Sequence, residues 1–161
     1  MKIEFDVKMT VGKMYDYMLY HTFHGMQGIL GEMVGILLII GFVITDPHKW
    51  LYLIFGLIVL FYLPVALFIN AARQVRLQPA FQDKLHYILS DEGIEVHLGE
   101  QVDSQPWENM QKAVSTSKNL IIYTGKNTAS LFPRADLGDQ EVAVIEMIST
   151  HMDPKKVNIR I

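Results

Sequence analysis

The stretch WLYLIFGLIVLFYLPVALFI, residues 50–69, carries no charged residue and is apolar along most of its length. With a rise of 1.5 Å per residue, a helix over this stretch is roughly 30 Å long, which is the thickness of the hydrocarbon core of a bilayer. Uncharged apolar stretches of this length are typical of transmembrane helices. The sequence therefore predicts that residues 50–69 cross a membrane.

A shorter apolar stretch, residues 28–44, precedes this one. As a helix it is about 25 Å long, so we expect its ends near the lipid headgroups. The connection, TDPHK at residues 45–49, contains an Asp-Pro pair that is typical of a turn. So short a connection predicts an antiparallel hairpin of two transmembrane helices. The alternative is a pair of core helices in a soluble domain, but the remaining chain is too small to wrap both.

Positive charge is unevenly distributed around this hairpin. The connection carries Lys49, whereas five basic residues flank the hairpin: Lys8, Lys13, Arg73, Arg76 and Lys84. Basic residues accumulate on the cytoplasmic side of membrane proteins. We therefore expect a multi-pass protein of the cell membrane, with both termini in the cytoplasm and the lipid bilayer as its first partner.

Glycine recurs every three or four residues along the first predicted span, at Gly25, Gly28, Gly31 and Gly35. At 3.6 residues per turn these positions lie within a sector of about 120° on one side of the helix. Small residues on one face allow another helix to approach closely. We expect this glycine stripe to form helix-packing contacts within the hairpin. The alternative is a seam between copies of the chain in a homo-oligomer.

One ionisable residue, Glu32, lies on the same side of the first span. Ionisable groups inside a membrane are rare and often functional. If Pro47 is the centre of the hairpin, Tyr62 lies at the same depth in the second helix. The pair predicts a structural hydrogen bond between Glu32 and Tyr62, with passage of protons or ions as the alternative.

The rest of the chain has the pattern of a β-rich domain. Residues 3–7 alternate polar and apolar residues like a strand, and Thr10 is placed to cap a helix that leads into the hairpin. Six further strands are expected at residues 85–89, 94–98, 101–107, 111–116, 120–124 and 128–132. A helix over residues 139–151, capped by Asp136 or Asp139 and with Val142 among its apolar residues, would close the resulting bent sheet or small barrel.

The first two strands after the hairpin predict their own register. A turn over residues 90–93 pairs Leu89 with Ile94 and Tyr87 with Val96, so that apolar side chains share one face. Gly93 is expected in a left-handed conformation at a bulge.

The same register places His86 opposite His97 on the other face. An exposed histidine pair without a role is the expected state. A pH-sensing or metal-binding role is the alternative.

Composition excludes several classes of function. The chain has no cysteine, so thiol catalysis, disulfides and cysteine metal sites are ruled out. A net charge of −3 does not indicate a nucleic-acid partner. Phosphate-binding glycine loops, GxSxG and HExxH motifs are also missing from the sequence. We therefore expect a protein that is not an enzyme and has no catalytic residue, cofactor or metal.

Four segments, in their order along the chain, resemble a known family: LHYILSDEGI at residues 85–94, PWENM at 106–110, NLIIY at 119–123 and LFPR at 131–134. They are similar to the YcxB-like proteins, small bacterial membrane proteins whose cytoplasmic part resembles a pleckstrin-homology (PH) fold. The resemblance implies a membrane α+β protein, with a transmembrane hairpin inserted into a PH-like antiparallel sheet or barrel that a C-terminal helix caps. Residues 1–23 and 73–161 would form the cytoplasmic domain, and residues 24–72 the hairpin.

Trp107 and Arg134 match the pattern of this family and are candidates for a ligand or partner surface. Trp107 is also expected as a core residue at a strand end. Arg134 is expected to brace a loop or to meet a phosphate-rich surface. The resemblance carries no activity with it.

Two functions follow as hypotheses. The first is a membrane-anchored, non-enzymatic binding or regulatory module that holds a PH-like domain at the inner leaflet, where it binds a protein partner, a lipid head group or a second copy. The second is a subunit of a homo-oligomeric pore or transport accessory that uses the glycine stripe and Glu32.

Overall fold

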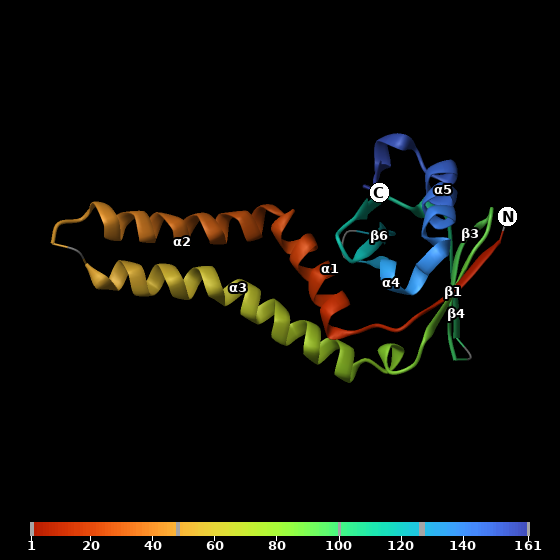
Figure 1. Ribbon diagram of the computed structural model, residues 1–161, viewed down its shortest axis with the longest axis horizontal. Helices are drawn as coiled ribbons and strands as arrows, with labels where there is room; N and C mark the ends of the chain where they lie inside the picture. The colour runs from red at the N-terminus through yellow and green to blue at the C-terminus, as the bar shows by residue number, and fades with distance from the viewer. Residues whose placement is uncertain (1, 48, 100, 126–127, 161) are drawn as a thin grey trace.

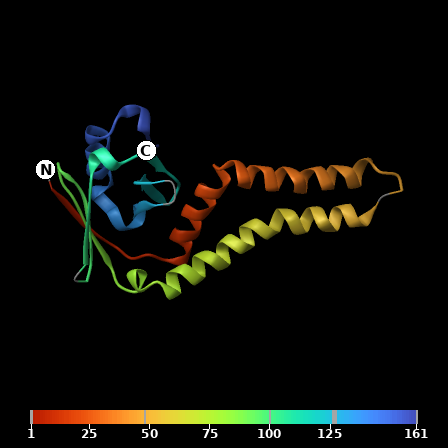
Figure 2. The same ribbon diagram turned by 180° about the vertical axis from the view of Figure 1, so that it is seen from behind.

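The computed structural model of the chain describes residues 2–47, 49–99, 101–125 and 128–160. A long helical hairpin extends from one side of a two-sheet domain, and a shorter helix crosses the junction between them (Figure 1). The same arrangement is seen from behind in Figure 2.

In order along the chain, the elements are β1 (Ile3–Val7), α1 (Val11–Phe23), α2 (Met26–Ile44), α3 (Trp50–Leu77), the 3-10 turn η1 (Pro79–Phe81), β2 (Leu85–Leu89), β3 (Gly93–Leu98), β4 (Gln101–Pro106), η2 (Trp107–Asn109), β5 (Lys112–Ser115), β6 (Asn119–Tyr123), β7 (Ala129–Pro133), α4 (Arg134–Leu137), η3 (Gly138–Gln140), α5 (Glu141–His151), η4 (Pro154–Lys156) and β8 (Val157–Asn158). The two hairpin helices follow β1 and α1 and precede the other elements of the domain.

The strands form two four-stranded sheets. The first has the order β1-β2-β3-β4 and is antiparallel throughout, and the second has the order β7-β6-β5-β8. Since β1 precedes the hairpin and pairs with β2 after it, the two helices are inserted into this sheet. The strands expected from the sequence are present. The short β8, which pairs with β5 in parallel, was not expected because it has no alternating pattern of its own.

The predicted register of the first hairpin is confirmed. Leu89 pairs with Ile94 and Tyr87 with Val96. The expected left-handed conformation of Gly93 is wrong, because the described residues with positive φ are Gly99 and Gly138. Gly93 is instead required by a close approach of β4, since a Cβ there would lie 2.3 Å from the carbonyl oxygen of Gln105.

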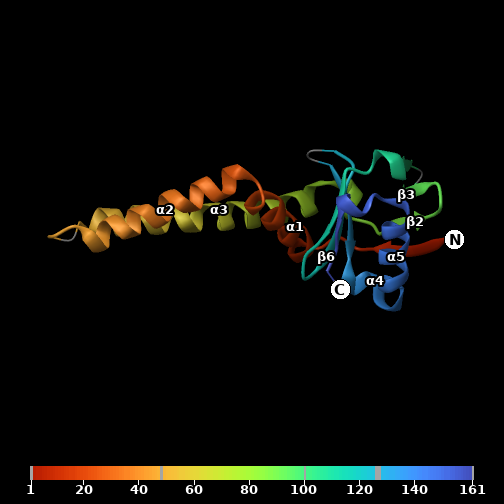
Figure 3. The same ribbon diagram turned by 90° about the horizontal axis from the view of Figure 1, so that it is seen from above.

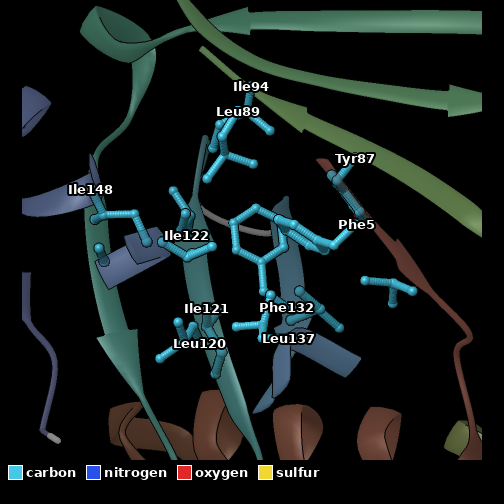
Figure 4. Close-up of a cluster of buried hydrophobic side chains, with 14 of the residues drawn as sticks. Phe5, Tyr87, Leu89, Ile94, Leu120, Ile121, Ile122, Phe132, Leu137 and Ile148 are labelled. Carbon is cyan, nitrogen blue, oxygen red and sulfur yellow. The ribbon is translucent and has the colours of Figure 1, made fainter. Parts of the chain in front are cut away.

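Phe132 of β7 joins the two sheets in the core. Its ring lies 5.1 Å from that of Phe5 and 4.9 Å from that of Tyr87, both on the first sheet. Ile148 of α5 is fully buried in the same cluster, which Figure 4 shows between the two sheets. The core therefore depends on residues from both ends of the chain.

Helix α1 covers the outer face of the second sheet. All residues of β6 are buried, so this strand has the core on one face and α1 on the other. The Tyr17 ring of α1 lies 6.4 Å from that of Tyr123 in β6, and the Tyr15 ring packs edge-on against Phe68 of α3. The predicted cap of α1 is confirmed, since the Thr10 side chain accepts a hydrogen bond from the backbone N–H of Lys13.

The C-terminal helix differs from the prediction at its start. Residues 134–140 form α4 and η3, and α5 begins at Glu141 without a side-chain cap. Asp136 does not cap the helix because it pairs with Lys13 of α1. Val142 is 67% exposed, whereas Val144, Met147 and Ile148 carry the buried face.

Helices α2 and α3 are antiparallel and lie side by side in the part of the hairpin far from the domain, and α3 then diverges from α2 and continues along α1 (Figures 1 and 3). Helix α3 continues past the expected end at Ile69 to Leu77 and includes Arg73 and Arg76. Among the described residues, α3 alone is long and apolar enough to cross a membrane by itself. Helix α1 and residues 28–44 of α2 meet the same criteria only together, as a pair bent by 78°.

Candidate functional site

Helices α2 and α3 approach each other closely at Gly35 and Gly56. A Cβ at Gly35 would lie 2.7 Å from the Leu60 side chain, and one at Gly56 would lie 3.0 Å from the Gly35 carbonyl oxygen. Gly35 is thus a packing position, as the stripe predicts. Its partner Gly56 was missed because a single glycine in an apolar helix gives no periodic signal.

The other stripe positions do not share this contact. Gly28 packs against the last turn of α1, where a Cβ would lie 2.4 Å from the Thr22 carbonyl oxygen, and Gly25 lies close to the same oxygen. Gly31 has nothing within 4 Å of its Cβ position among the described residues. Two of the four stripe positions therefore lie against the end of α1, one lies against α3, and one is open.

The predicted hydrogen bond between Glu32 and Tyr62 is wrong. Tyr62 is 70% exposed, and no hydrogen bond joins it to Glu32 within the part of the chain that the structure describes. The symmetry of the hairpin about Pro47 predicts the depth of Tyr62 in the membrane, but it does not predict toward which side of α3 the tyrosine side chain points. Tyr62 follows Gly56 by six residues, which is about 120° around the helix from the contact face.

A buried polar cluster fixes α1 to the second sheet. Asp16 of α1 accepts hydrogen bonds from the Thr116 hydroxyl and, at 2.7 Å, from the Asn119 amide, and Asn119 also donates to the backbone oxygen of Lys13 at 3.1 Å. Asn119 has no exposed surface. Lys13 in turn pairs with Asp136 of α4 at 2.6 Å. We call Lys13, Asp16, Thr116, Asn119 and Asp136 the α1 clamp.

This clamp was not found in the sequence, because its members are about 100 residues apart. The one local signal is that Asn119 interrupts an apolar strand. A buried amide needs partners, so such an asparagine indicates a polar contact across the core, although not with which element.

The predicted histidine pair is present on the outer face of the first sheet. His86 pairs with His97 across the β2–β3 ladder, and the ring centroids are 6.0 Å apart. The structure adds acidic neighbours from β1, since Asp6 lies 2.8 Å from Nδ1 of His86 and Glu4 lies 3.8 Å from its Nε2. The hydrogen bond with His86 lowers the pKa of Asp6.

Among the described residues, no group of three or more His, Asp or Glu side chains is placed to hold a metal ion. Metal binding by His86 and His97 alone, and pH sensing by the pair, stay predictions.

Trp107 and Arg134 both make contacts within the domain. The Trp107 ring is 7% exposed, its indole N–H donates to the Ser90 carbonyl oxygen at 2.8 Å, and it stacks on His151. Arg134 donates to the Thr116 carbonyl oxygen at 3.2 Å and pairs with Glu141. These contacts match the core and bracing roles. A role in ligand binding stays a prediction for both residues.

The described surface also contains an apolar groove beside β4 that the sequence analysis missed. It has a volume of about 530 Å³ and is lined by Phe81, Leu85, Tyr87, Val96 and Leu98, with Gln101–Asp103 of β4 along one side. Burial raises the pKa of Tyr87 to about 12. A second hollow of about 230 Å³ shares Phe81, Leu85 and Tyr87 and reaches Met14 of α1 and Gln74 of α3. The groove therefore borders on the base of the hairpin.

Together these features define an α+β protein in which a two-sheet domain carries a clamped, apolar helical hairpin. Residues 89–148 match the family model described as YcxB-like protein. This match confirms the predicted resemblance over these residues, which run from the end of β2 into α5. No curated protein and no solved structure matches the chain.

Proposed function

We propose that this protein is a membrane-anchored, non-enzymatic binding or regulatory module. In this proposal α2 and α3 both cross the cell membrane, and the two-sheet domain is held at its cytoplasmic surface together with both termini. The observation that carries the proposal is the combination of an apolar hairpin exterior with a clamped junction to the domain.

The exterior of the hairpin favours a lipid environment. Among the described residues, the exposed large hydrophobic side chains lie on α2 and α3, with the exceptions of Val102 and Val142. Soluble proteins rarely expose a continuous apolar surface of more than a few hundred Å². This argument applies to α2 as well as to α3, although α2 is the shorter helix.

The junction favours a fixed rather than a tethered domain. Helix α1 packs against α3 through Tyr15 and Phe68 and is held to the second sheet by the α1 clamp. Movement of the hairpin helices would therefore be transmitted to β6. Such a coupling suits a module in which binding to the domain changes the arrangement of the membrane helices, or in which a change in the helices alters binding to the domain.

A PH-like fold for the domain is part of the proposal. Two packed sheets with a C-terminal helix over the core support it. The short strand β8 follows this helix, and in the proposed PH-like fold it is an additional strand.

Topology is tested by cysteine labelling, because the chain contains no cysteine of its own. Lys49→Cys lies in the hairpin connection and Lys155→Cys on the exposed side of the domain. We expect an impermeant thiol reagent to label Lys49→Cys in intact cells and Lys155→Cys only after lysis. Labelling of both in intact cells, or the reverse pattern, would refute the orientation.

A second candidate function is favoured by Glu32. Its carboxylate makes no hydrogen bond or ion pair within the described residues, although it lies in an apolar helix next to the open position Gly31. An unpaired ionisable group in a membrane helix suits a proton or ion path between copies of the chain. The mass of the detergent-solubilised protein discriminates between the two functions, since a monomer excludes a pore. If the protein is a ring, Glu32→Gln should abolish proton or ion flux in vesicles without changing the assembly.

A further inference from the structure

We propose that the free edge of β4, together with the apolar groove beside it, binds an extended peptide that carries a basic side chain. This inference deepens the proposed function, because it names the kind of partner that the binding module takes. It rests on three observations: an exposed edge strand, a hollow next to it and an unpaired carboxylate between them.

Strand β4 is the exposed edge of the first sheet. It pairs with β3 over residues 101–106, and no strand of the described part of the chain lies on its other side. Five of its six residues are exposed, unlike the residues of the other described strands in both sheets. Exposed edges of this kind template the addition of another strand, and proteins commonly protect them with lysine or proline. Within β4 only Pro106, at the end, gives such protection.

The pairing of β3 with β4 shows which backbone groups are free. Leu98 and Gln101 pair across a connection of two residues, so we take them as the hydrogen-bonded pair that closes the hairpin. Hydrogen-bonded and non-hydrogen-bonded pairs alternate along an antiparallel ladder. The N–H and C=O groups of Val102 and Ser104 then point away from β3. Pro106, which follows in the same series, has no N–H to offer.

The side chains of β4 that share the face of the groove are polar. Asp103 pairs with Val96 and Gln101 with Leu98, so these side chains point toward the groove. Asp103 accepts a hydrogen bond from Gln105 at 3.2 Å, and no cation pairs with it among the described residues. A basic side chain on an added strand would lie directly opposite Asp103.

The same carboxylate disfavours a second copy of the chain as the occupant. Two β4 strands that pair antiparallel through Val102 and Ser104 place one Asp103 opposite the other. Like charges directly opposite each other destabilise a strand pair. A separate peptide with a lysine or arginine at this position avoids the repulsion.

The proposal therefore specifies a short sequence pattern. In an antiparallel strand, the residue two positions after the one opposite Asp103 lies opposite Gln101, at the end of the groove near Leu98. We expect the peptide to read basic-x-apolar, with the apolar side chain entering the groove. Strand addition of this type takes its affinity from main-chain hydrogen bonds and its specificity from alternate side chains.

The probe is a displayed library of random nine-residue peptides, selected on the full chain in detergent micelles. Ser104→Pro removes the outward N–H of β4, and a proline is tolerated on an edge strand at such a position. Ser104→Ala is the matched control that keeps the N–H. We expect selected peptides to carry the basic-x-apolar pattern, to bind the wild type and Ser104→Ala equally, and to bind Ser104→Pro roughly tenfold more weakly.

A charge reversal supplies a second test that does not depend on proline. Selection on Asp103→Lys should yield acidic residues at the position where the wild type selects basic ones. Thermal unfolding in the same detergent confirms that each variant is folded. Peptides that bind Ser104→Pro as well as the wild type would overturn the proposal, as would a library that yields no enriched peptide on the folded wild type. Neither result affects the cysteine-labelling test of membrane topology, so the two proposals can fail separately.

Discussion

The helical hairpin and the two-sheet domain contain the same kinds of apolar residue but place them differently. Phe61 of α3 is 64% exposed, whereas Phe132 of β7 has no exposed surface. Each hairpin helix packs against the other and, at its base, against α1, and leaves the rest of its circumference uncovered. Two sheets and α5 enclose the core of the domain from several sides. The difference shows that the two regions require different surroundings, and that their stability depends on different contacts.

The largest expected effect tests the domain side of this comparison. Phe132→Ala removes a ring that contacts Phe5 and Tyr87, and we expect it to lower the free energy of unfolding by about 3–5 kcal/mol. Phe61→Ala is the matched change in the hairpin and should be nearly neutral in detergent, because its ring is already exposed. Chemical unfolding followed by near-ultraviolet circular dichroism measures both. Equal losses would show that the hairpin surface is packed against protein.

A second prediction uses pH to test the burial of Tyr87 in the domain. Burial raises the pKa of Tyr87 to about 12 from an ordinary value of 10.0, so its contribution to stability is complete below pH 10 and is lost as the pH rises toward 12. Tyr87→Phe should therefore reduce the alkaline loss of stability by about 2–3 kcal/mol. The pH profiles of unfolding of the wild type and the variant measure this difference. A wild-type profile in the Tyr87→Phe variant would mean that the ring is hydrated in the folded protein.

The smallest expected effect concerns packing inside the hairpin. Gly35→Leu would clash with Leu60 and the Gly56 backbone, and we expect a loss of about 1–3 kcal/mol, the usual range for overpacking. Gly31→Leu should be tolerated, because nothing lies within 4 Å of its Cβ position among the described residues. Thermal stability of the two variants in the same detergent compares them. If Gly31→Leu proves the more damaging change, that face contacts another copy of the chain, and the pore hypothesis gains support.

In the domain, the strands were predicted well. In the hairpin, the two apolar helices were predicted, but α3 extends beyond its expected end at Ile69. Alternation and turn residues set the β2–β3 register, because a slip by one residue would expose Tyr87 and Leu89 together. The same reasoning failed for the capping of the C-terminal helix, where Asp136 was available to Lys13 of α1 as well as to its own helix. A local sequence pattern can show which nearby residue is able to cap a helix. It does not show that a residue far away in the sequence, such as Lys13, binds the same carboxylate.

The candidate sites also contain features that local sequence patterns predict and features that depend on contacts between distant residues. The neighbouring positions of His86 and His97 follow from the strand register alone, whereas their acidic neighbours on β1 depend on a pairing across the inserted hairpin. The groove beside β4 was not predicted, although η1 and the strands β2, β3 and β4 that bound it follow one another along the chain, since its shape depends on how these elements are placed in space. A cavity forms where several elements meet, whereas a sequence pattern describes the face of a single helix or strand.

By itself, the sequence determined the two apolar helices, the strands on either side of them and the register of the first β-hairpin. Hydrophobic periodicity and turn chemistry act over a few residues, so they can be read without the fold. Only the tertiary structure decided that Gly35 meets Gly56, that Tyr62 points away from Glu32, that α1 is clamped to Asn119, and that β4 keeps a free edge. These features depend on the rotation of helices about their axes and on contacts between residues up to about 100 positions apart, which no local pattern specifies.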